Sequence, residues 1–413
     1  MGAFDIERAH ERFSDAGWAT AAFTSAFPTQ ARWGFAQGFD VYHDPLPRLP
    51  TQRDWRDERV ATEVVDTPDH EHVDGAIAEQ ALAAMKRLAQ QDQPFFLAAG
   101  FVRPHLPFVV PRKYWDLYQA DSITLAKNPF LPKDSPAFAM NTMYELRDYM
   151  DFLGTPTPRD GSLTEAQQRR LKHGYYASVS FIDALIGRLL DELERLDLAD
   201  NTIVVLWGDH GWKLGEHNSW CKQSNYEIDA RVPLIIRAPS ASANGRKTEA
   251  LVELVDVYPT LCELAGLPVS DHLEGRSIVP LLSTPEQPWK QAAFSQFQRK
   301  DGPTPLMGYS MRTHRYRYIE WQDRRTRKVV AKELYDHKND PHENTNVADA
   351  AGHKDTLVEL DRQMWATLPR PPKYEPPKPR RPQVTFRNRG DVPLTVFWIT
   401  PDGEEKQTGV IPP

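Results

Sequence analysis

The feature that most constrains the fold is an alternation of helix-periodic segments with short apolar runs. Residues 73–91 (VDGAIAEQALAAMKRLAQQ) place apolar side chains at helical spacing, namely Ile77, Ala81, Met85 and Leu88. The apolar run at 94–101 (PFFLAAGF) follows directly and predicts a buried strand. Because helices that alternate with apolar strands are typical of α/β domains, this order predicts a mostly parallel sheet that helices flank.

The alternation continues along the chain. Ser162 and Glu165 predict a capping box for a helix that ends near Leu198. One apolar stripe runs along this helix through Leu171, Tyr175, Val179, Ile182, Ile186, Leu190 and Leu193. A strand at 201–208 (NTIVVLWG) follows, and a third strand at 232–238 (VPLIIRA) precedes a helix that ends at Gly266. The order predicts an α/β core over residues 1–283.

The remainder of the chain has a different character. Residues 106–160 are rich in proline and weakly periodic, which predicts a long excursion from the core. Residues 284–370 alternate and are rich in turns, and they predict a smaller α+β subdomain with an antiparallel sheet. A proline-rich linker is expected at 371–383 and a partial β-sandwich module at 384–413, around an Asp402-Gly403 hairpin turn.

Composition excludes several classes of protein. The chain has 413 residues, of which 40% are hydrophobic and 26% charged, as in ordinary globular proteins. A net charge of −7 argues against a nucleic-acid partner, because that footprint would be basic. No apolar run approaches the roughly 18 residues of a membrane span, and the N-terminus shows no signal-peptide pattern. Two cysteines, Cys221 and Cys262, are too few for a disulfide framework.

Polar residues gather where two of the predicted strands end. Asp209 and His210 directly follow the strand at 201–208, the end of a strand where open α/β sheets bind their ligands. Carboxylate and imidazole groups both ligate divalent cations, and carboxylate favours Ca²⁺ or Mg²⁺. His105 lies between two prolines after the strand at 94–101, and Lys222 offers a point charge for an anion. An isolated Asp-His pair after a strand is also typical of a turn or cap.

Five longer sequence blocks follow one another along the chain. They begin with GFVRPHLPF and GYYASVSFIDALIGRLLDELE and continue with GDHGWKLGEHNSWCKQSNYEIDARVPLIIRAP. LVDVYPTLCELAGLPVSDHLEGRSIVPLL and ELYDHKNDPHENTN complete the series. In this order the blocks resemble the sulfatase family of the alkaline-phosphatase superfamily, in its iduronate-sulfatase-like branch, and the resemblance covers roughly residues 10 to 350. It implies hydrolysis of the sulfate ester of a sulfated carbohydrate, and a periplasmic or secreted location.

The resemblance also implies roles for individual residues. In this family a cysteine oxidised to formylglycine attacks the sulfate ester, and Ca²⁺, rather than Mg²⁺, binds the sulfate oxygens. Asp209 and His210 match the late metal-binding pair, Lys222 matches the lysine that contacts the sulfate, and His105 matches the histidine near the leaving group. A metal ion and lysine stabilise charge on the sulfuryl oxygens, and a histidine can protonate the departing alcohol.

Two departures from the family pattern set the functional alternatives. The 413 residues contain neither the family's early aspartate pair nor its Cys-x-Pro-Ser-Arg motif, and Ser25 and Pro28 stand where many members have lysine and histidine. We therefore expect a sulfatase whose nucleophile lies upstream of Met1, so that the chain as given is inactive. The alternatives are a pseudoenzyme that binds a sulfated or phosphorylated sugar, and a phosphodiesterase or phosphonate hydrolase of the same superfamily.

Other residues near the motifs have ordinary structural explanations. Cys221 lies beside Lys222, but its flanks bear no likeness to the modification motif, so we interpret it and Cys262 as packing residues. We expect Lys213 to be a solvated loop residue and leave His217 outside the catalytic set. Arg103 is a weak candidate for a substrate contact, and packing is expected of Tyr175, Asp183, Trp220 and the aromatic residues of 309–321. The tail from 384 weakly resembles the β domain of the von Hippel-Lindau protein through its VTFRNR opening.

Overall fold

The computed structural model describes residues 8–25, 29–31, 34–44, 59–368, 394–399 and 405–411, the last two segments as backbone. The chain divides into two compact units, residues 1–371 and 372–413, which are described separately. None of the helices in these described segments is long and apolar enough to span a membrane. The predicted linker at 371–383 and the Asp402-Gly403 turn lie outside the described residues.

Parallel strands form the core of the first unit. β1 (Ala19–Phe23) lies between β2 (Val41–His43) and β4 (Phe95–Ala99), and both pairings are parallel. A second parallel pair joins β3 (Thr62–Val65) to β5 (Phe108–Pro111). α1 (Ala9–Asp15) contacts β1, and α2 (Val73–Leu88) packs its apolar face on β1 and β4. The four predicted apolar residues of α2, from Ile77 to Leu88, are all buried.

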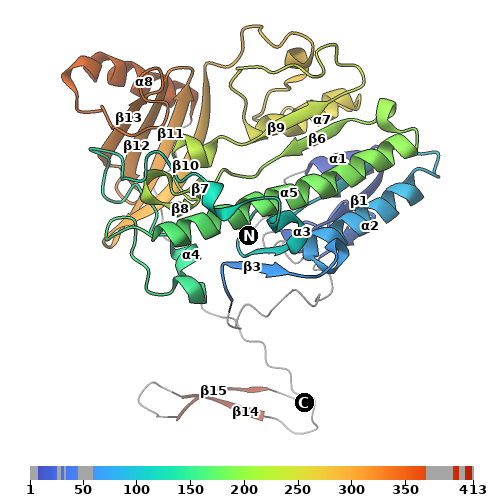
Figure 1. Cartoon of the computed structure of the whole chain (residues 1–413), viewed down its shortest axis with the longest axis horizontal. Helices are drawn as coiled ribbons and strands as arrows, with labels where there is room; N and C mark the ends of the chain where they lie inside the picture. The colour runs from blue at the N-terminus through green and yellow to red at the C-terminus, as the bar shows by residue number, and fades with distance from the viewer. Residues whose placement is uncertain are drawn as a thin grey trace. The chain divides into compact units, whose positions relative to one another are not determined.

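The long helix α5 (Glu165–Arg195) crosses this core (Figure 1). Its cap differs from the prediction: Thr164 Oγ1 accepts from the backbone N–H of Gln167, and the Gln167 side chain accepts from the Thr164 N–H. The predicted stripe is correct at its ends but not throughout, because Val179 and Leu190 are exposed. The buried face carries the small residues Gly174 and Ala177 as well as larger ones, and a Cβ on Gly174 would lie 2.9 Å from the Cβ of Phe108 in β5. The helix can therefore pack directly against the strand.

Two strands and a loop follow α5. β6 (Val204–Trp207) pairs with β9 (Leu234–Arg237) in antiparallel orientation, so the prediction that 232–238 continues a parallel sheet is wrong. A parallel neighbour needs a crossover connection, usually a helix. Between these strands lie the hairpin of β7 (Lys213–Leu214) and β8 (Trp220–Cys221), with a 3₁₀ turn at Glu216–Asn218, and the one-turn helix α6 (Glu227–Ala230), which do not form a crossover helix. α7 (Val257–Leu264) then ends as predicted, with Gly266 at a φ of 70°.

The predicted excursion at 106–160 is partly ordered structure of the core. It opens with β5 and continues through α3 (Arg112–Trp115) and α4 (Tyr144–Arg147). Leu146 and Phe152 are buried in one cluster with Phe108 and Leu171. The proline-rich composition concealed this strand and these helical turns, because four residues are too few for a periodic pattern.

An antiparallel sheet completes the first unit, as predicted for residues 284–370. The strands β10 (Ala292–Asp301), β11 (Thr304–Thr313), β12 (Tyr316–Asp323) and β13 (Val329–Asp336) pair in chain order (Figure 1). α8 (Lys354–Thr367) packs Leu360 and Met364 against Tyr318 and Leu334. Tyr309, Tyr318 and Trp321 are buried, which confirms the aromatic alternation as sheet core.

These observations confirm the predicted fold class: an α/β fold with parallel sheets flanked by helices and a C-terminal antiparallel sheet. In the second unit, β14 (Leu394–Ile399) and β15 (Glu405–Ile411) form an antiparallel pair. The boundary at 283/284 and the resemblance of the tail to a β-sandwich stay predictions.

Candidate active site

The loop that follows β6 brings the predicted site residues together. Asp209 and His210 come directly after the end of this strand, and Lys222 follows β8. Gly211 holds the loop against α6, because its N–H donates to the carbonyl of Asp229 at 2.8 Å. A Cβ at Gly211 would lie 1.9 Å from the carbonyl oxygen of Ile228, so this approach requires glycine.

The ring of Trp212 lies at the centre of the candidate site. The Lys222 ammonium lies 4.8 Å from its centroid, and the His105 ring lies edge-on at 5.5 Å. The His210 ring stacks on the same Trp212 ring, with 6.1 Å between the two centroids. Three of the four predicted site residues therefore share one aromatic neighbour, and Asp209 is the residue next to His210.

Lys222 and His105 are in direct contact. Lys222 Nζ lies 2.6 Å from Nε2 of His105 and 2.6 Å from Oε1 of Glu145, and the same Nε2 lies 2.7 Å from that carboxylate oxygen. Asn141 supports the lysine from behind, because its side-chain amide donates to the carbonyl of Lys222. A cation, an imidazole and a carboxylate thus form one compact group.

The partners of His105 define where its protons can lie. Nδ1 lies 2.7 Å from the carbonyl oxygen of Leu106, which can only accept, so Nδ1 carries a hydrogen. An ammonium can only donate, so in the neutral imidazole Nε2 accepts from Lys222. When Nε2 is protonated it donates to Glu145 instead. The site therefore provides a partner for His105 in both protonation states.

Glu145 is the residue that the sequence did not reveal. It lies in α4, within the proline-rich segment, and no motif marks it. Burial alone would raise the pKa of this carboxyl, but hydrogen bonds from His105 and Lys222 outweigh burial and lower the pKa to about 2. Glu145 is therefore a carboxylate that balances the charge of Lys222.

Asp209 and His210 together offer fewer ligand atoms than a calcium ion takes. The Asp209 side chain is 85% exposed, and its Oδ2 lies 3.5 Å from Nε2 of His210. Nδ1 of His210 lies 2.9 Å from the carbonyl of Gly211, which leaves Nε2 as the atom for a ligand. Calcium takes roughly six to eight oxygen ligands, whereas this pair offers one carboxylate and one imidazole. The pair alone therefore does not fit a complete calcium site.

Lys213 corrects one prediction. We expected a solvated loop residue, but its side chain is fully buried, and Nζ donates to Asp229 Oδ2 at 2.5 Å and to Ser224 Oγ at 2.7 Å. Burial lowers the pKa of Lys213, and the Asp229 carboxylate opposes that effect. The ion pair ties the loop after β6 to α6, and Lys213 is a structural residue.

The remaining residues near the site are structural, as the sequence indicated. Cys221 is 2% exposed among Leu106, Leu146 and Trp220, and burial raises the pKa of its thiol. Cys262 is buried on α7. His217 is buried, and its Nε2 lies 2.8 Å from the carbonyl of His342. Tyr175 and Trp220 also pack, whereas Arg103 lies 3.8 Å from the buried carboxylate of Asp74.

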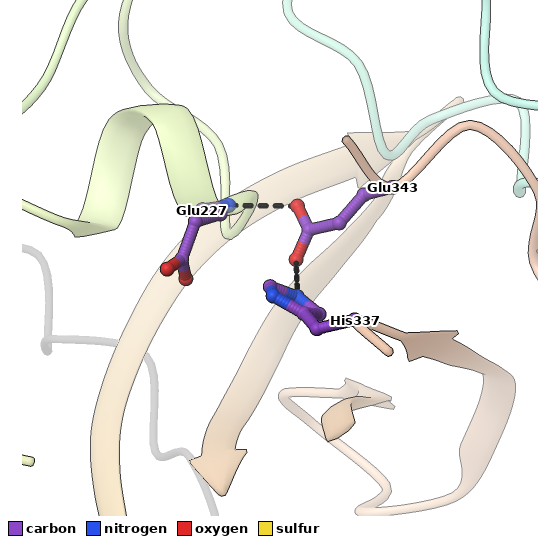
Figure 2. Close-up of side chains that lie close together, drawn as sticks. All are labelled: Glu227, His337 and Glu343. Atoms are coloured by element: carbon purple, nitrogen blue, oxygen red, sulfur yellow. Dashed lines mark hydrogen bonds and ion pairs between the residues drawn. The ribbon is translucent and has the colours of Figure 1, made fainter. Parts of the chain in front are cut away.

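A second group of potential metal ligands includes none of the predicted site residues. Glu227, His337 and Glu343 place one ligand atom each within 4.8 Å of one another (Figure 2). The guanidinium of Arg317, however, donates to Glu343 Oε1 at 2.6 Å and to Glu227 Oε2. Arg317 is 2% exposed, so a fixed positive charge already satisfies both carboxylates. The group is therefore a buried ion-pair network, since a metal would have to compete with this guanidinium.

The fold and the candidate site define a ligand-binding α/β protein, and comparison with known proteins agrees with this class. An α/β sheet with charged side chains at the ends of its strands is typical of a ligand-binding α/β protein. A family model described as Sulfatase matches residues 12–267, and one described as N-sulphoglucosamine sulphohydrolase, C-terminal, matches residues 215–369. The chain belongs to the sulfatase family.

Curated relatives include iduronate 2-sulfatases. The protein from Mus musculus is 33% identical over 363 residues, covering 72% of this chain and 66% of its own length. The protein from Homo sapiens is 34% identical over 319 residues, covering 63% of this chain and 58% of its own length. The chain thus spans less than two thirds of either relative.

Solved structures share the fold. A protein in complex with its substrate, D-glucosamine-2-N,6-O-disulfate, has a TM-score of 0.65 at 22% identity and covers 88% of this chain and 82% of its own. The phosphonate monoester hydrolase of Agrobacterium radiobacter has a TM-score of 0.67 at 22% identity and covers 88% of this chain and 80% of its own.

Proposed function

We propose that these residues form the part of a sulfatase that holds the sulfate group and the leaving alcohol of a sulfated sugar. The observation that carries the proposal is the contact of Lys222 with His105 beside Trp212, in a chain of the sulfatase family. The name of the relatives, iduronate 2-sulfatase, and the description of the second family model, N-sulphoglucosamine sulphohydrolase, support a sulfated sugar as the substrate.

In this proposal Lys222 binds a sulfate oxygen. Its ammonium contacts the imidazole of His105. Only 12% of the Lys222 side chain is exposed, so solvent and salt screen its interaction with an anion only weakly. Glu145 now accepts from that ammonium, and a sulfate oxygen would take over part of this contact. Electrostatic stabilisation of charge on the transferring group is the contribution we assign to Lys222.

His105 supplies the proton of the leaving alcohol. Its side chain is 38% exposed, so a substrate can approach the ring, and a substrate oxygen would replace one of the present contacts of Nε2. Protonated Nε2 is stabilised by Glu145 at 2.7 Å, which makes Glu145 a positioning residue for the imidazolium. After the proton leaves, Nε2 again accepts from Lys222.

Two elements of the chemistry need groups beyond those described. We propose that Asp209 and His210 contribute part of a Ca²⁺ site, which when complete would supply additional positive charge at the sulfate oxygens. The formylglycine nucleophile requires a Cys-x-Pro-Ser-Arg motif, and the 413 residues do not contain one. We therefore propose that the chain as given binds but does not hydrolyse sulfate esters.

Two other functions remain as alternatives. A pseudoenzyme that only binds a sulfated sugar is favoured by the missing motif, and phosphonate or phosphodiester hydrolysis is favoured by the fold of the Agrobacterium enzyme. The three functions can be distinguished with a longer protein in which this chain is preceded by a segment that contains the nucleophile motif. We expect it to hydrolyse an aryl sulfate faster than an aryl phosphonate, and the pseudoenzyme would hydrolyse neither.

The binding part of the proposal is tested on the chain itself. Titration with 4-nitrophenyl sulfate in a calorimeter is expected to show binding that Lys222→Gln weakens at least tenfold, because charge-assisted hydrogen bonds are the strong ones. Arg362→Gln, on the exposed face of α8, serves as the matched control. Equal binding by the wild type and Lys222→Gln would overturn the proposal.

A further inference from the structure

A basic pocket lies where the end of α6 meets the antiparallel sheet. Its volume is about 380 Å³, and its lining comes from α6, from the turn between β11 and β12, and from the segment after β13. Four cationic side chains line it, namely Arg231, Arg312, Arg315 and Lys338, against the single carboxylate of Glu227. The chain as a whole carries a net charge of −7, so this positive pocket is a local exception.

The ion pairs around the pocket leave two of these charges without a full partner. Asp336 balances Arg315 through two contacts of 2.9 and 2.8 Å, and Arg312 lies 3.1 Å from Glu227. Arg231 reaches the same Glu227 only at 3.9 Å, and its side chain is 74% exposed. Lys338 is exposed and forms no ion pair within residues 59–368. Arg231 and Lys338 therefore provide the excess positive charge.

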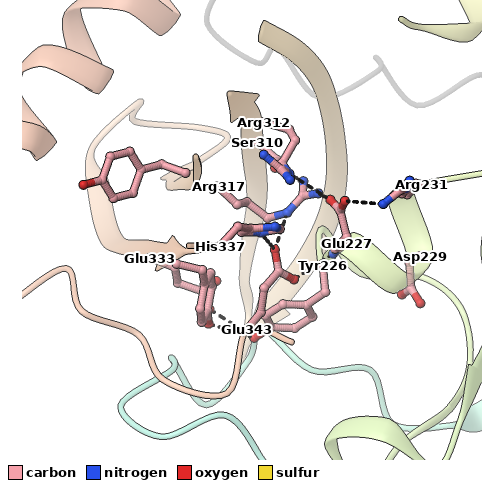
Figure 3. A network of polar contacts seen from close by, with 12 residues as sticks. Tyr226, Glu227, Asp229, Arg231, Ser310, Arg312, Arg317, Glu333, His337 and Glu343 are labelled. Atoms are coloured by element: carbon pink, nitrogen blue, oxygen red, sulfur yellow. Dashed lines mark hydrogen bonds and ion pairs between the residues drawn. The ribbon is translucent and has the colours of Figure 1, made fainter. Parts of the chain in front are cut away.

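The buried network behind the pocket holds its wall in place. Figure 3 shows the carboxylate of Glu227 between Arg231 on one side and Arg312 and Arg317 on the other, with Glu343 lower in the view. Arg317 bridges Glu227 and Glu343, and the backbone N–H of Glu227 donates to Glu343 at 2.7 Å. Burial alone would raise the pKa of Glu343, but Arg317 and His337 lower it to about 2. Since the inner carboxylates are already satisfied, an incoming ligand meets the outer cations.

We propose that this pocket binds a sulfate or carboxylate group of an anionic saccharide. The anionic group would lie between Arg231 and Lys338, and the exposed His314 offers a further polar contact on the lining. A volume of 380 Å³ suits a sugar-sized ligand. The saccharide part of the inference rests on the proposed function, whereas the anion site itself rests on the pocket alone.

The pocket and the candidate active site share one structural element. Glu227 opens α6 and Arg231 follows it, while Asp229 of the same helix holds Gly211 and Lys213 of the loop that carries Asp209. Neither Lys222 nor His105 lines the pocket. The two anion sites are therefore separate sets of side chains that separate substitutions can remove.

Sulfate-dependent thermal stabilisation tests the proposal on the whole chain. A ligand that binds the folded state raises the midpoint of unfolding according to its concentration and affinity. We expect sodium sulfate to raise the midpoint above that in sodium chloride of equal ionic strength. Arg231→Gln/Lys338→Gln should weaken the pocket's sulfate affinity at least tenfold and lose part of the rise, whereas Arg362→Gln should lose none.

The outcomes separate the pocket from the proposed function. If Arg231→Gln/Lys338→Gln shows the same sulfate-dependent rise as the wild type, the pocket proposal is overturned. If that double variant loses part of the rise but Lys222→Gln does not, the pocket is supported and the proposed function fails. Glucuronate in place of sulfate tests the carboxylate arm, and a rise with Zn²⁺ that His337→Gln removes would overturn the anion assignment.

Discussion

The ammonium of Lys222 lies 2.6 Å from both the Nε2 atom of His105 and the Oε1 atom of Glu145. Lys222 and His105 are separated by 117 residues in the chain, and both lie in connecting segments outside the strands and helices. This contact joins the segment after β4 to the loop after β6. In the proposed function it makes one anion-binding group out of two sequence motifs, and an incoming anion would compete with Glu145 for the lysine.

Replacing Glu145 by glutamine is expected to tighten anion binding at Lys222. The substitution removes a negative charge next to the bound anion but keeps a side-chain oxygen that can accept from the lysine. Calorimetry with 4-nitrophenyl sulfate should show affinity about threefold to tenfold higher than that of the wild type, a coupling of about 1 kcal/mol. Unchanged or weaker binding would mean that Glu145 does not compete with the anion.

Glu145 should also make stability depend on pH in the acid range. Its pKa is lowered to about 2 in the folded chain from an ordinary value of 4.5, so its contribution is present above about pH 4.5 and is lost as the pH falls toward 2. The lost free energy of unfolding is at most about 3 kcal/mol, because one pKa unit corresponds to about 1.4 kcal/mol. Urea unfolding at several pH values between 5 and 3 measures the free energy of unfolding. This free energy should fall less steeply with decreasing pH for Glu145→Gln than for the wild type. Identical slopes would contradict this assignment.

Breaking the buried Lys213–Asp229 pair should strongly destabilise the chain. Lys213→Met leaves the Asp229 carboxylate buried without its cation, which costs about 3–5 kcal/mol in comparable pairs. The double variant Lys213→Met/Asp229→Leu should recover part of this loss, since it leaves no buried charge. Urea denaturation of the single and double variants measures both effects, and simple additivity of the two substitutions would refute the direct pairing.

Calcium should bind the chain weakly. Asp209 and His210 offer one carboxylate and one imidazole, far from the oxygen-rich shell that gives high affinity. We expect a dissociation constant on the order of millimolar or weaker in calorimetry, and Asp209→Asn should weaken it further. Sub-micromolar affinity would show that other residues of the chain complete the site.

Cys221 should be unreactive in the folded chain. Its side chain is buried and burial raises the pKa of the thiol, so little thiolate is available near neutral pH. Reaction with a disulfide reagent should therefore require unfolding, and we expect no sulfate-ester turnover that depends on this residue. Hydrolysis abolished by Cys221→Ala would identify Cys221 as a nucleophile after all.

The fold was predicted well where a periodic pattern ran for more than two helical turns, and where an apolar run or a glycine marked the end of an element. α2, β4, β6 and the glycine end of α7 lie where their periodicity and punctuation place them. The direction of β9 was wrong, because local pattern does not encode whether the chain crosses over or turns back. The cap of α5 was misplaced by two residues, since Thr164 with Gln167 competes with Ser162 and Glu165 for the same role.

The site was only partly visible in the sequence. His105 and His210 follow predicted apolar strands, Lys222 lies in the same motif as His210, and all three contact Trp212 in the structure. Glu145 lies in a four-residue helix within a proline-rich segment, where no periodicity marks it. Lys213 looked solvated because its partner Asp229 is 16 residues away and only the folded loop buries both. Long-range ion pairs of this kind leave no local signal.

The most direct test of the account is a crystal structure of the chain grown with selenate, whose anomalous scattering locates the anion. We predict selenate within hydrogen-bond distance of Lys222 Nζ and His105 Nε2, beside the ring of Trp212, with Glu145 displaced from the lysine. A crystal in which selenate binds elsewhere, while Lys222 keeps its contact with Glu145, would contradict the claim that this group holds a tetrahedral oxyanion.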